Sequence, residues 1–255
     1  MTEKTTARPP VGLAIASLLR ADSLVLLRSR VSVVLSLLLP IVILVATSLG
    51  KNPTRLGSAG TAIGLALTLG LITSCLLGYS LTLAHDRDIG VLQRLRVSPA
   101  PTWTIMTSRL VVQLISNLIA STIVVIVGAI LHGVTLDIGQ YLLVLCCAVV
   151  GAAVFLALGQ ALVGLVQSTS AINAIGRTLF IVLVLLGVVG ATGVLGDTLQ
   201  SIAGWTPVGA LMILFSDVID QAGWSAQDAY ALIACAGYII VFSFVGIRWF
   251  RWETR

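Results

Sequence analysis

Residues that could support metal binding or proton transfer are few in this sequence, and their spacing suits neither task. The four cysteines lie inside apolar stretches, without the Cys-x-x-Cys spacing or the nearby histidines of a zinc site. Free cysteine behaves as a small hydrophobic residue, so we expect four free, buried thiols. His85 follows one long apolar run and His132 follows the next, which puts them on opposite sides of a membrane. The pattern therefore predicts no metal site.

Motifs of nucleotide binding and hydrolysis are absent from the sequence. Lys51 follows Gly50 but lacks the upstream glycine and the next hydroxyl residue of a phosphate-binding loop. Neither His-Glu-x-x-His nor Gly-x-Ser-x-Gly occurs. Ionisable residues hardly occur within the long apolar runs, which argues against ion-coupled carriers and intramembrane enzymes. We expect a chain that is not an enzyme and holds no cofactor, and whose energy comes from another protein.

The composition is that of an integral membrane protein. Of the 255 residues, 58% are hydrophobic and 10% are charged, and the mean hydropathy is +1.07. A water-soluble fold cannot bury this much apolar surface. The first ten residues lack the apolar core and the cleavage site of a signal peptide, so we expect the apolar runs to belong to the mature protein.

Six apolar runs are long enough to cross a bilayer as helices. A helix that spans roughly 30 Å of hydrocarbon needs about 20 mostly apolar residues, because its backbone polar groups must bond within the helix. The first run contains Pro40, which a membrane helix tolerates as a kink. The predicted fold is one all-α transmembrane domain over residues 1–255, with spans at 31–49, 61–84, 105–131, 141–166, 174–195 and 230–250.

The basic residues predict the orientation of these spans, because Lys and Arg are retained on the cytoplasmic side of a membrane. With six spans, the segments on the side of both termini hold thirteen of the fifteen basic residues. The other side holds only Lys51 and Arg55. Both termini should therefore be cytoplasmic. Since the net charge of +5 follows from this asymmetry, we expect no nucleic-acid binding.

Two further segments are apolar without being plain spans. Residues 12–30 combine apolar positions with scattered charges, which predicts an interfacial helix along the inner membrane surface; a charged extension of the first span is the alternative. Residues 196–228 contain an apolar stretch too short to cross, preceded by Trp205 and Pro207. This pattern predicts short external re-entrant helices, with an ordinary structured loop as the alternative.

The segment 85–110 carries the most informative cytoplasmic pattern. After Asp86 and Asp88, apolar residues recur at helical spacing while arginines project elsewhere, and Pro99 and Pro101 end the helix. A short helix with one apolar face on the cytoplasmic side needs a surface to pack against. On pattern alone, a docking helix for another protein and a loop that packs against its own neighbours are equally supported.

Three amide side chains lie within the spans. Gln113 and Asn117 are four residues apart, hence on one face of the third span, and Gln160 lies in the fourth. Uncharged amides at this depth contact a substrate or bond between helices, and bonding between helices is the expected role. Gly70, Ser74 and Gly78 form a stripe of small residues on the second span, and Gly60 and Gly64 continue a similar spacing. This stripe allows close helix packing, either within the subunit or between subunits.

One motif and several flanking features match a known family. The motif is RDIGVLQRLRVSPAP, residues 87–101, whose characteristic positions are Gly90, Leu95, Arg96, Ser98 and Pro99. An acidic residue at 86 or 88 stands where glutamate is usual, and Val91 stands where threonine is usual. The flanking features are Arg28 and Arg30 before a first span with a proline, the Trp205-x-Pro207 pair, and the closing RWFRWE. Together they resemble the permease subunits of the ABC type-2 exporter family, which includes bacterial drug-resistance and antibiotic-export permeases.

The resemblance implies a permease of the bacterial plasma membrane that pairs with a second copy or with a related permease. It also implies a separate ATP-binding-cassette ATPase subunit, which carries ATP and Mg and docks on the segment 87–99 as a coupling helix. The coupling residues that it implies are Arg87, Asp88, Gly90, Val91, Leu92, Arg94, Leu95, Arg96 and Pro99.

The implied function is ATP-driven export of a hydrophobic or amphipathic drug, antibiotic or peptide. A permease for lipids or lipid-linked glycans or for cytochrome assembly is one alternative, and a non-transporting membrane scaffold is another. A membrane enzyme is disfavoured because no catalytic group lies at mid-depth.

Overall fold

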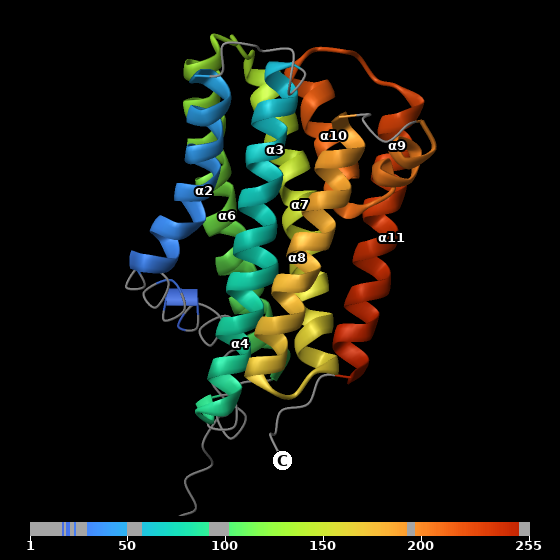
Figure 1. The fold of residues 1–255 in the computed structure, drawn as a ribbon. Helices are drawn as coiled ribbons and strands as arrows, with labels where there is room; N and C mark the ends of the chain where they lie inside the picture. Colours follow the sequence, from blue (N-terminus) through green and yellow to red (C-terminus); the bar gives the residue numbers. More distant parts are fainter. Residues whose placement is uncertain are drawn as a thin grey trace, which may run out of the picture.

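The computed structural model describes residues 17, 19–20, 23, 30–49, 58–91, 102–192 and 197–249. These residues form a bundle of helices that run along one another (Figure 1), without a strand in the described part of the chain. The helices are α2 (Arg30–Leu49), α3 (Ala59–Leu71), η2 (Ile72–Gly78), α4 (Tyr79–Asp88), α6 (Thr102–His132), α7 (Ile138–Leu165), α8 (Thr169–Thr192), α9 (Asp197–Gly204), α10 (Pro207–Ile219) and α11 (Ala226–Trp249).

Five helical segments are long and apolar enough to cross a membrane, which confirms an all-α, multi-pass membrane protein. They are Ala59–Asp88, which joins α3, η2 and α4, then Thr104–His132, Ile138–Leu165, Thr169–Val188 and Ala226–Trp249. They fall at five of the six predicted spans. Their helices begin earlier than predicted because polar caps lie outside the apolar runs: Ser58 accepts the Thr61 N–H at 3.1 Å, and Asp137 accepts the Gly139 N–H.

The remaining predicted span corresponds to α2. This helix contains Pro40 and packs against α3 and α6. Helix α2 has 20 residues, and the part whose side chains the structure describes is the apolar stretch Leu37–Leu49, so the count of six spans stays a prediction. The predicted interfacial helix at 12–30 lies almost entirely outside the described residues and also stays a prediction.

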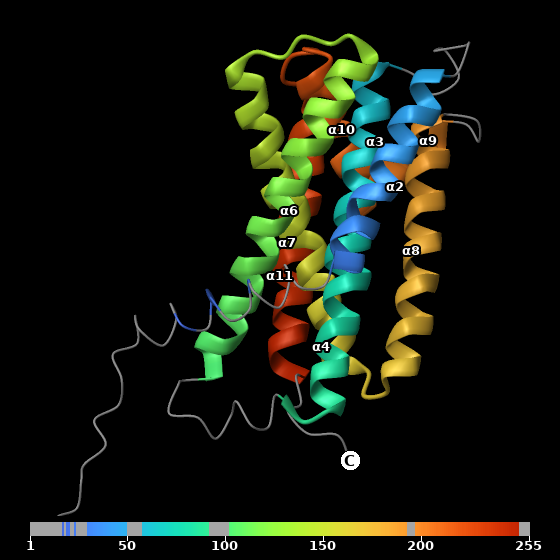
Figure 2. The same ribbon diagram turned by 90° about the vertical axis from the view of Figure 1, so that its left-hand side faces the viewer.

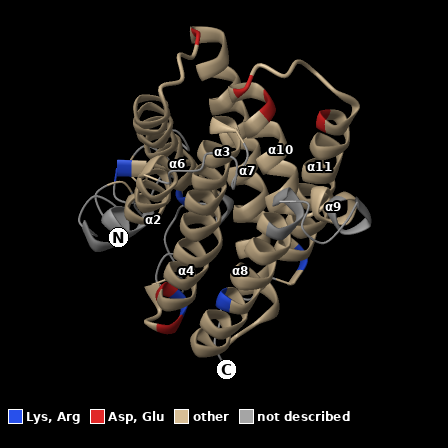
Figure 3. Ribbon diagram, turned by 45° about the horizontal axis from the view of Figure 1, so that its top comes forward, with Lys and Arg blue, Asp and Glu red and all other residues tan. Residues whose placement is uncertain are grey.

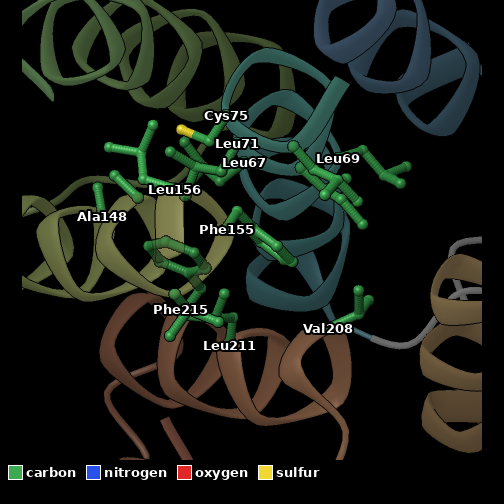
Figure 4. Packing of buried hydrophobic residues seen from close by; sticks show 14 of the residues in the cluster. Leu67, Leu69, Leu71, Cys75, Ala148, Phe155, Leu156, Val208, Leu211 and Phe215 are labelled. Atoms are coloured by element: carbon green, nitrogen blue, oxygen red, sulfur yellow. The ribbon is translucent and has the colours of Figure 1, made fainter. Parts of the chain in front are cut away.

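Helices α3, α7 and α10 form the centre of the bundle. Phe155 of α7 and Phe215 of α10 are fully buried among leucines of all three helices (Figure 4). A Cβ on Gly64 would lie 3.0 Å from that of Phe215, and one on Gly151 would lie 2.9 Å from Leu71 Cδ1. Gly64, one of the small residues expected to allow close packing, thus lets α10 pack closely against α3 within the same chain. In lipid, such van der Waals packing replaces the hydrophobic effect as the force between helices.

Two short helices, α9 and α10, connect α8 to α11. Helix α10 has thirteen residues, about 20 Å, which is too short for a hydrocarbon core of roughly 30 Å. Thr206 caps its start by accepting the Gly209 N–H at 3.1 Å, and buried Pro207 is its first residue, where no N–H is needed. Asp220, just after its end, accepts the Gly60 N–H at 2.9 Å, at the start of α3. Within the described residues 197–219, the segment is therefore helical and not an ordinary loop, and its external, re-entrant placement stays a prediction.

A π-helical turn, η2, interrupts the second span, although this stretch contains no proline. At this turn α7 comes so close that a Cβ on Gly159 would lie 3.0 Å from the carbonyl oxygen of Cys75. A π turn widens the helix locally and is frequent at functional sites. Sequence analysis did not predict it.

Candidate coupling site at the end of helix α4

Helix α4 ends where α6 and α8 begin and where α7 and α11 end (Figures 1 and 2). Acidic and basic residues gather at this helix end (Figure 3). Asp86, Arg87 and Asp88 are consecutive, and their side chains bond to three different elements of the bundle.

Arg87 binds the end of α7. Its side chain is only 1% exposed. Nη1 donates to the Val163 carbonyl at 3.0 Å, and Nη2 donates to the carbonyls of Val166 at 3.1 Å and Gln167 at 2.6 Å. The last carbonyls of a helix lack hydrogen-bond partners within it and carry partial negative charge. A guanidinium there donates the missing hydrogen bonds and balances the charge. Arg87 therefore caps α7 from another helix.

Asp86 binds α6 through an ion pair. Arg109 Nη1 lies 2.5 Å from Asp86 Oδ2, and both side chains are mostly buried. A pair shielded from water keeps more of its electrostatic attraction than a surface pair. This contact fixes the end of α4 to the first turns of α6.

Asp88 binds α8 at its first residue. The hydroxyl of Thr169 donates to Asp88 Oδ2. A carboxylate at a helix start also meets the positive end of the helix dipole. Because Asp88 is exposed, this contact is the most accessible of the three.

Gly90 ends the helix in a conformation that suits glycine. Its φ is +73°, in the left-handed region, and its N–H donates to the Arg87 carbonyl at 3.1 Å. Ile89 before it is 54% exposed, and Val91 after it is partly exposed. The chain therefore leaves α4 at Gly90 with apolar side chains at its surface.

The structure thus describes the first part of the predicted coupling segment. The Arg87 side chain, which sequence analysis grouped with the docking residues, is buried against α7, whereas Asp88, Gly90 and Val91 lie at the helix end. The other predicted coupling residues lie outside the described residues, and their role stays a prediction: Leu92, Arg94, Leu95, Arg96 and Pro99.

The three amides lie on α6 and α7, which both pack against the second span. Gln113 donates to the Ser74 hydroxyl of η2 at 2.9 Å, and buried Asn117 donates to the Gln113 carbonyl at 2.8 Å. On the other side, the Tyr79 hydroxyl donates to Gln160 Oε1 at 2.8 Å. Gln113 and Gln160 thus make contacts between helices on either side of the π turn. Contact with a substrate stays a prediction.

Trp205 and Pro207 lie at the junction of α9 and α10. The Trp205 ring is half-exposed and lies 5.8 Å from the Tyr230 ring, centroid to centroid. The Trp205 carbonyl accepts the Tyr238 hydroxyl at 3.0 Å. These contacts connect the junction to α11.

The cysteines are free thiols, but they are not all buried. Cys75 and Cys235 are buried, Cys147 is partly buried, and Cys146 is exposed. The prediction of four buried thiols is wrong for Cys146, because α7 is apolar on all sides and its sequence does not show which face is covered. No group of three metal-ligating side chains occurs among the residues that the structure describes.

The bundle and its long apolar helices define a polytopic helical membrane protein. Residues 14–219 match the family model of the ABC-2 type transporter, and the chain belongs to that family. The match runs from the segment before α2 to the end of α10 and leaves α11 outside. A search of curated proteins finds no significant match. Membership makes the chain a membrane-spanning ABC permease subunit and implies an ABC ATPase as its partner.

Proposed function

We propose that this permease exports a hydrophobic or amphipathic drug, antibiotic or peptide from a bacterial cell. It lies in the plasma membrane with both termini in the cytoplasm and works as a pair of permease subunits. A separate subunit binds ATP and Mg, hydrolyses the ATP, and docks on the segment 87–99.

The observation that supports this proposal is the linkage at the end of α4. The segment that would meet the ATPase follows directly on three residues that bond to α6, to the end of α7 and to α8. A displacement of the docking segment therefore reaches three further helices besides its own. Export requires such a concerted movement, because a substrate path opens only when several helices shift together.

The exposed face of α8 supports pairing with a second permease. Ile181, Val182 and Leu185 of this helix are exposed. An apolar face at membrane depth is covered either by lipid or by another helix.

Docking can be tested by cysteine crosslinking on purified complexes. The tagged chain, with its four native cysteines replaced, carries either Val91→Cys at the end of α4 or Ile138→Cys, an exposed control residue at the opposite end of the bundle. We expect an ABC ATPase to co-purify and to crosslink to the cysteine at position 91 alone. Absence of an ATPase, or equal crosslinking at position 138, would reject the docking site.

Export can be tested separately in inverted membrane vesicles. Vesicles that contain the complex should accumulate a lipophilic fluorescent dye when ATP is added. A Gly90→Val variant should keep its ATPase partner but lose dye accumulation, since valine is strained at the φ of +73°. Accumulation without ATP, or none in the native complex, would contradict export of this substrate class.

A further inference from the structure

A groove of about 650 Å³ lies between α6, α7 and α11, the three helices seen together in Figure 2. Helix α7 forms its floor, because α6 and α11 both pack against it. Val149, Ala153 and Ala157 of this floor are spaced four residues apart on one face of α7, and the small side chains of the two alanines leave room above it. Leu110 of α6 and Ile239 of α11 contribute to its walls. This volume falls in the range of about 300 to 1,000 Å³ that ligand pockets occupy.

The groove has the length of one membrane leaflet. From Val149 to Gln160, α7 rises about 16 Å, and half of a hydrocarbon core of roughly 30 Å is about 15 Å. Its wall residues include Met106, near the start of α6, and Ile247, near the end of α11. The groove therefore occupies the half of the bundle nearer to the end of α4, and a molecule that fills it lies in that leaflet.

Gln160 supplies a hydrogen-bond donor at the end of this groove. Its Oε1 accepts the Tyr79 hydroxyl, whereas its amide nitrogen has no hydrogen-bond partner among the described residues. An unpaired N–H is costly in hydrocarbon, so a ligand with an acceptor at this position is favoured.

The depth of Gln160 identifies the acceptor. Helix α7 has 28 residues, about 42 Å, so about 6 Å at each end extends beyond a centred hydrocarbon core. Gln160 lies about 7.5 Å before Leu165, the last residue of the helix. With α7 centred in the bilayer, this depth matches the boundary of the hydrocarbon, where the ester carbonyls of a glycerophospholipid lie. The exposed Arg248, next to the groove residue Ile247, adds a positive charge on the headgroup side.

We propose that the groove binds one glycerophospholipid from the leaflet at the α4 end. Its acyl chain lies along the floor of Ala153 and Ala157, its ester carbonyl accepts a hydrogen bond from the Gln160 amide nitrogen, and its phosphate lies near Arg248. The lipid joins α6 to α11, which otherwise meet through α7.

The test is lipid retention by the purified full-length chain, measured by native mass spectrometry with phosphatidylglycerol in its ester form and in its diether form. The diether lipid has the same chains and headgroup but no carbonyl. We expect the native chain to retain the ester lipid about two- to tenfold better, the range expected for one hydrogen bond. Gln160→Leu should remove this preference, and Ala153→Trp should lower the retention of both lipids by filling the floor.

Leu143→Trp is the matched control, because Leu143 is exposed on the same helix but outside the groove. It should retain lipid as the native chain does. If Ala153→Trp fails to fold, Ala153→Leu replaces it, and Gln160→Leu tests the donor independently. Equal retention of ester and diether lipid by the native chain, or equal losses in the groove and control variants, would overturn the proposal.

Discussion

Replacing Arg87 by methionine tests the contact between α4 and α7 directly. Methionine keeps the length and the apolar stem of the side chain but donates no hydrogen bond. Three bonds are lost, and the carbonyls of Val163, Val166 and Gln167 lose a charged donor at the end of α7. We expect both the stability of the fold and its coupling to the docking segment to fall.

The magnitude follows from these three bonds. Hydrogen bonds between membrane helices average about 0.6 kcal/mol, and bonds to a charged group begin at about 1.5 kcal/mol. Loss of all three should therefore lower the free energy of unfolding by about 2 to 5 kcal/mol. Arg87→Lys should lose less, because the ammonium keeps the charge but cannot reach the carbonyls with a planar fork.

Chemical denaturation in detergent micelles measures this loss. Arg177→Met is the control, since Arg177 is an exposed arginine on α8 and its replacement should change stability by no more than about 0.5 kcal/mol. Transport in vesicles should fall in the Arg87 variant and persist in the control. If both variants unfold at the same denaturant concentration, the capping of α7 by Arg87 contributes nothing and the reasoning is refuted.

Three further predictions concern neighbouring contacts. Asp86→Asn and Arg109→Gln break the same pair, so the double variant should lose about 1 kcal/mol less stability than the two single losses combined; simple additivity would show that the pair contributes nothing. Gly90→Ala should lower the free energy of unfolding by about 1 to 2 kcal/mol, because its φ is +73°, and an unchanged denaturation midpoint would argue against this conformation. Burial, helped by the charge of Asp228, raises the pKa of Asp217, so the folded state holds this proton more tightly than the unfolded state. Stability should thus fall as pH rises from the ordinary carboxyl pKa through the raised one, and Asp217→Asn should flatten this fall in melting temperature, whereas parallel pH curves would contradict it.

Part of the candidate site could be predicted from the sequence. Gly90 was singled out within its motif, and the structure gives it a positive φ at the end of α4. The burial of Arg87 could not be predicted, because an arginine in a cytoplasmic loop is normally solvated. Arg87 is buried only because the end of α7 lies beside it. The only signal was its position at the very end of an apolar run, directly between Asp86 and Asp88.

The groove and the π turn depend on neighbours far apart in the chain. Ala153 and Ala157 are ordinary apolar residues in the sequence. They form the floor of a groove only because α6 and α11 lie on either side of them. The turn at η2 has no proline and faces Gly159, which is more than eighty residues away. Neither feature leaves a local pattern.

The sequence by itself determined the class of the protein and the position of five of its spans, because crossing a bilayer demands an apolar run of about 20 residues. It did not determine which face of each run is covered, since in lipid an apolar residue is satisfied equally by a neighbouring helix or by an acyl chain. Only the tertiary structure decided that Cys146 is exposed, that Phe155 is buried, and that three consecutive charged residues at the end of α4 connect it to α6, α7 and α8.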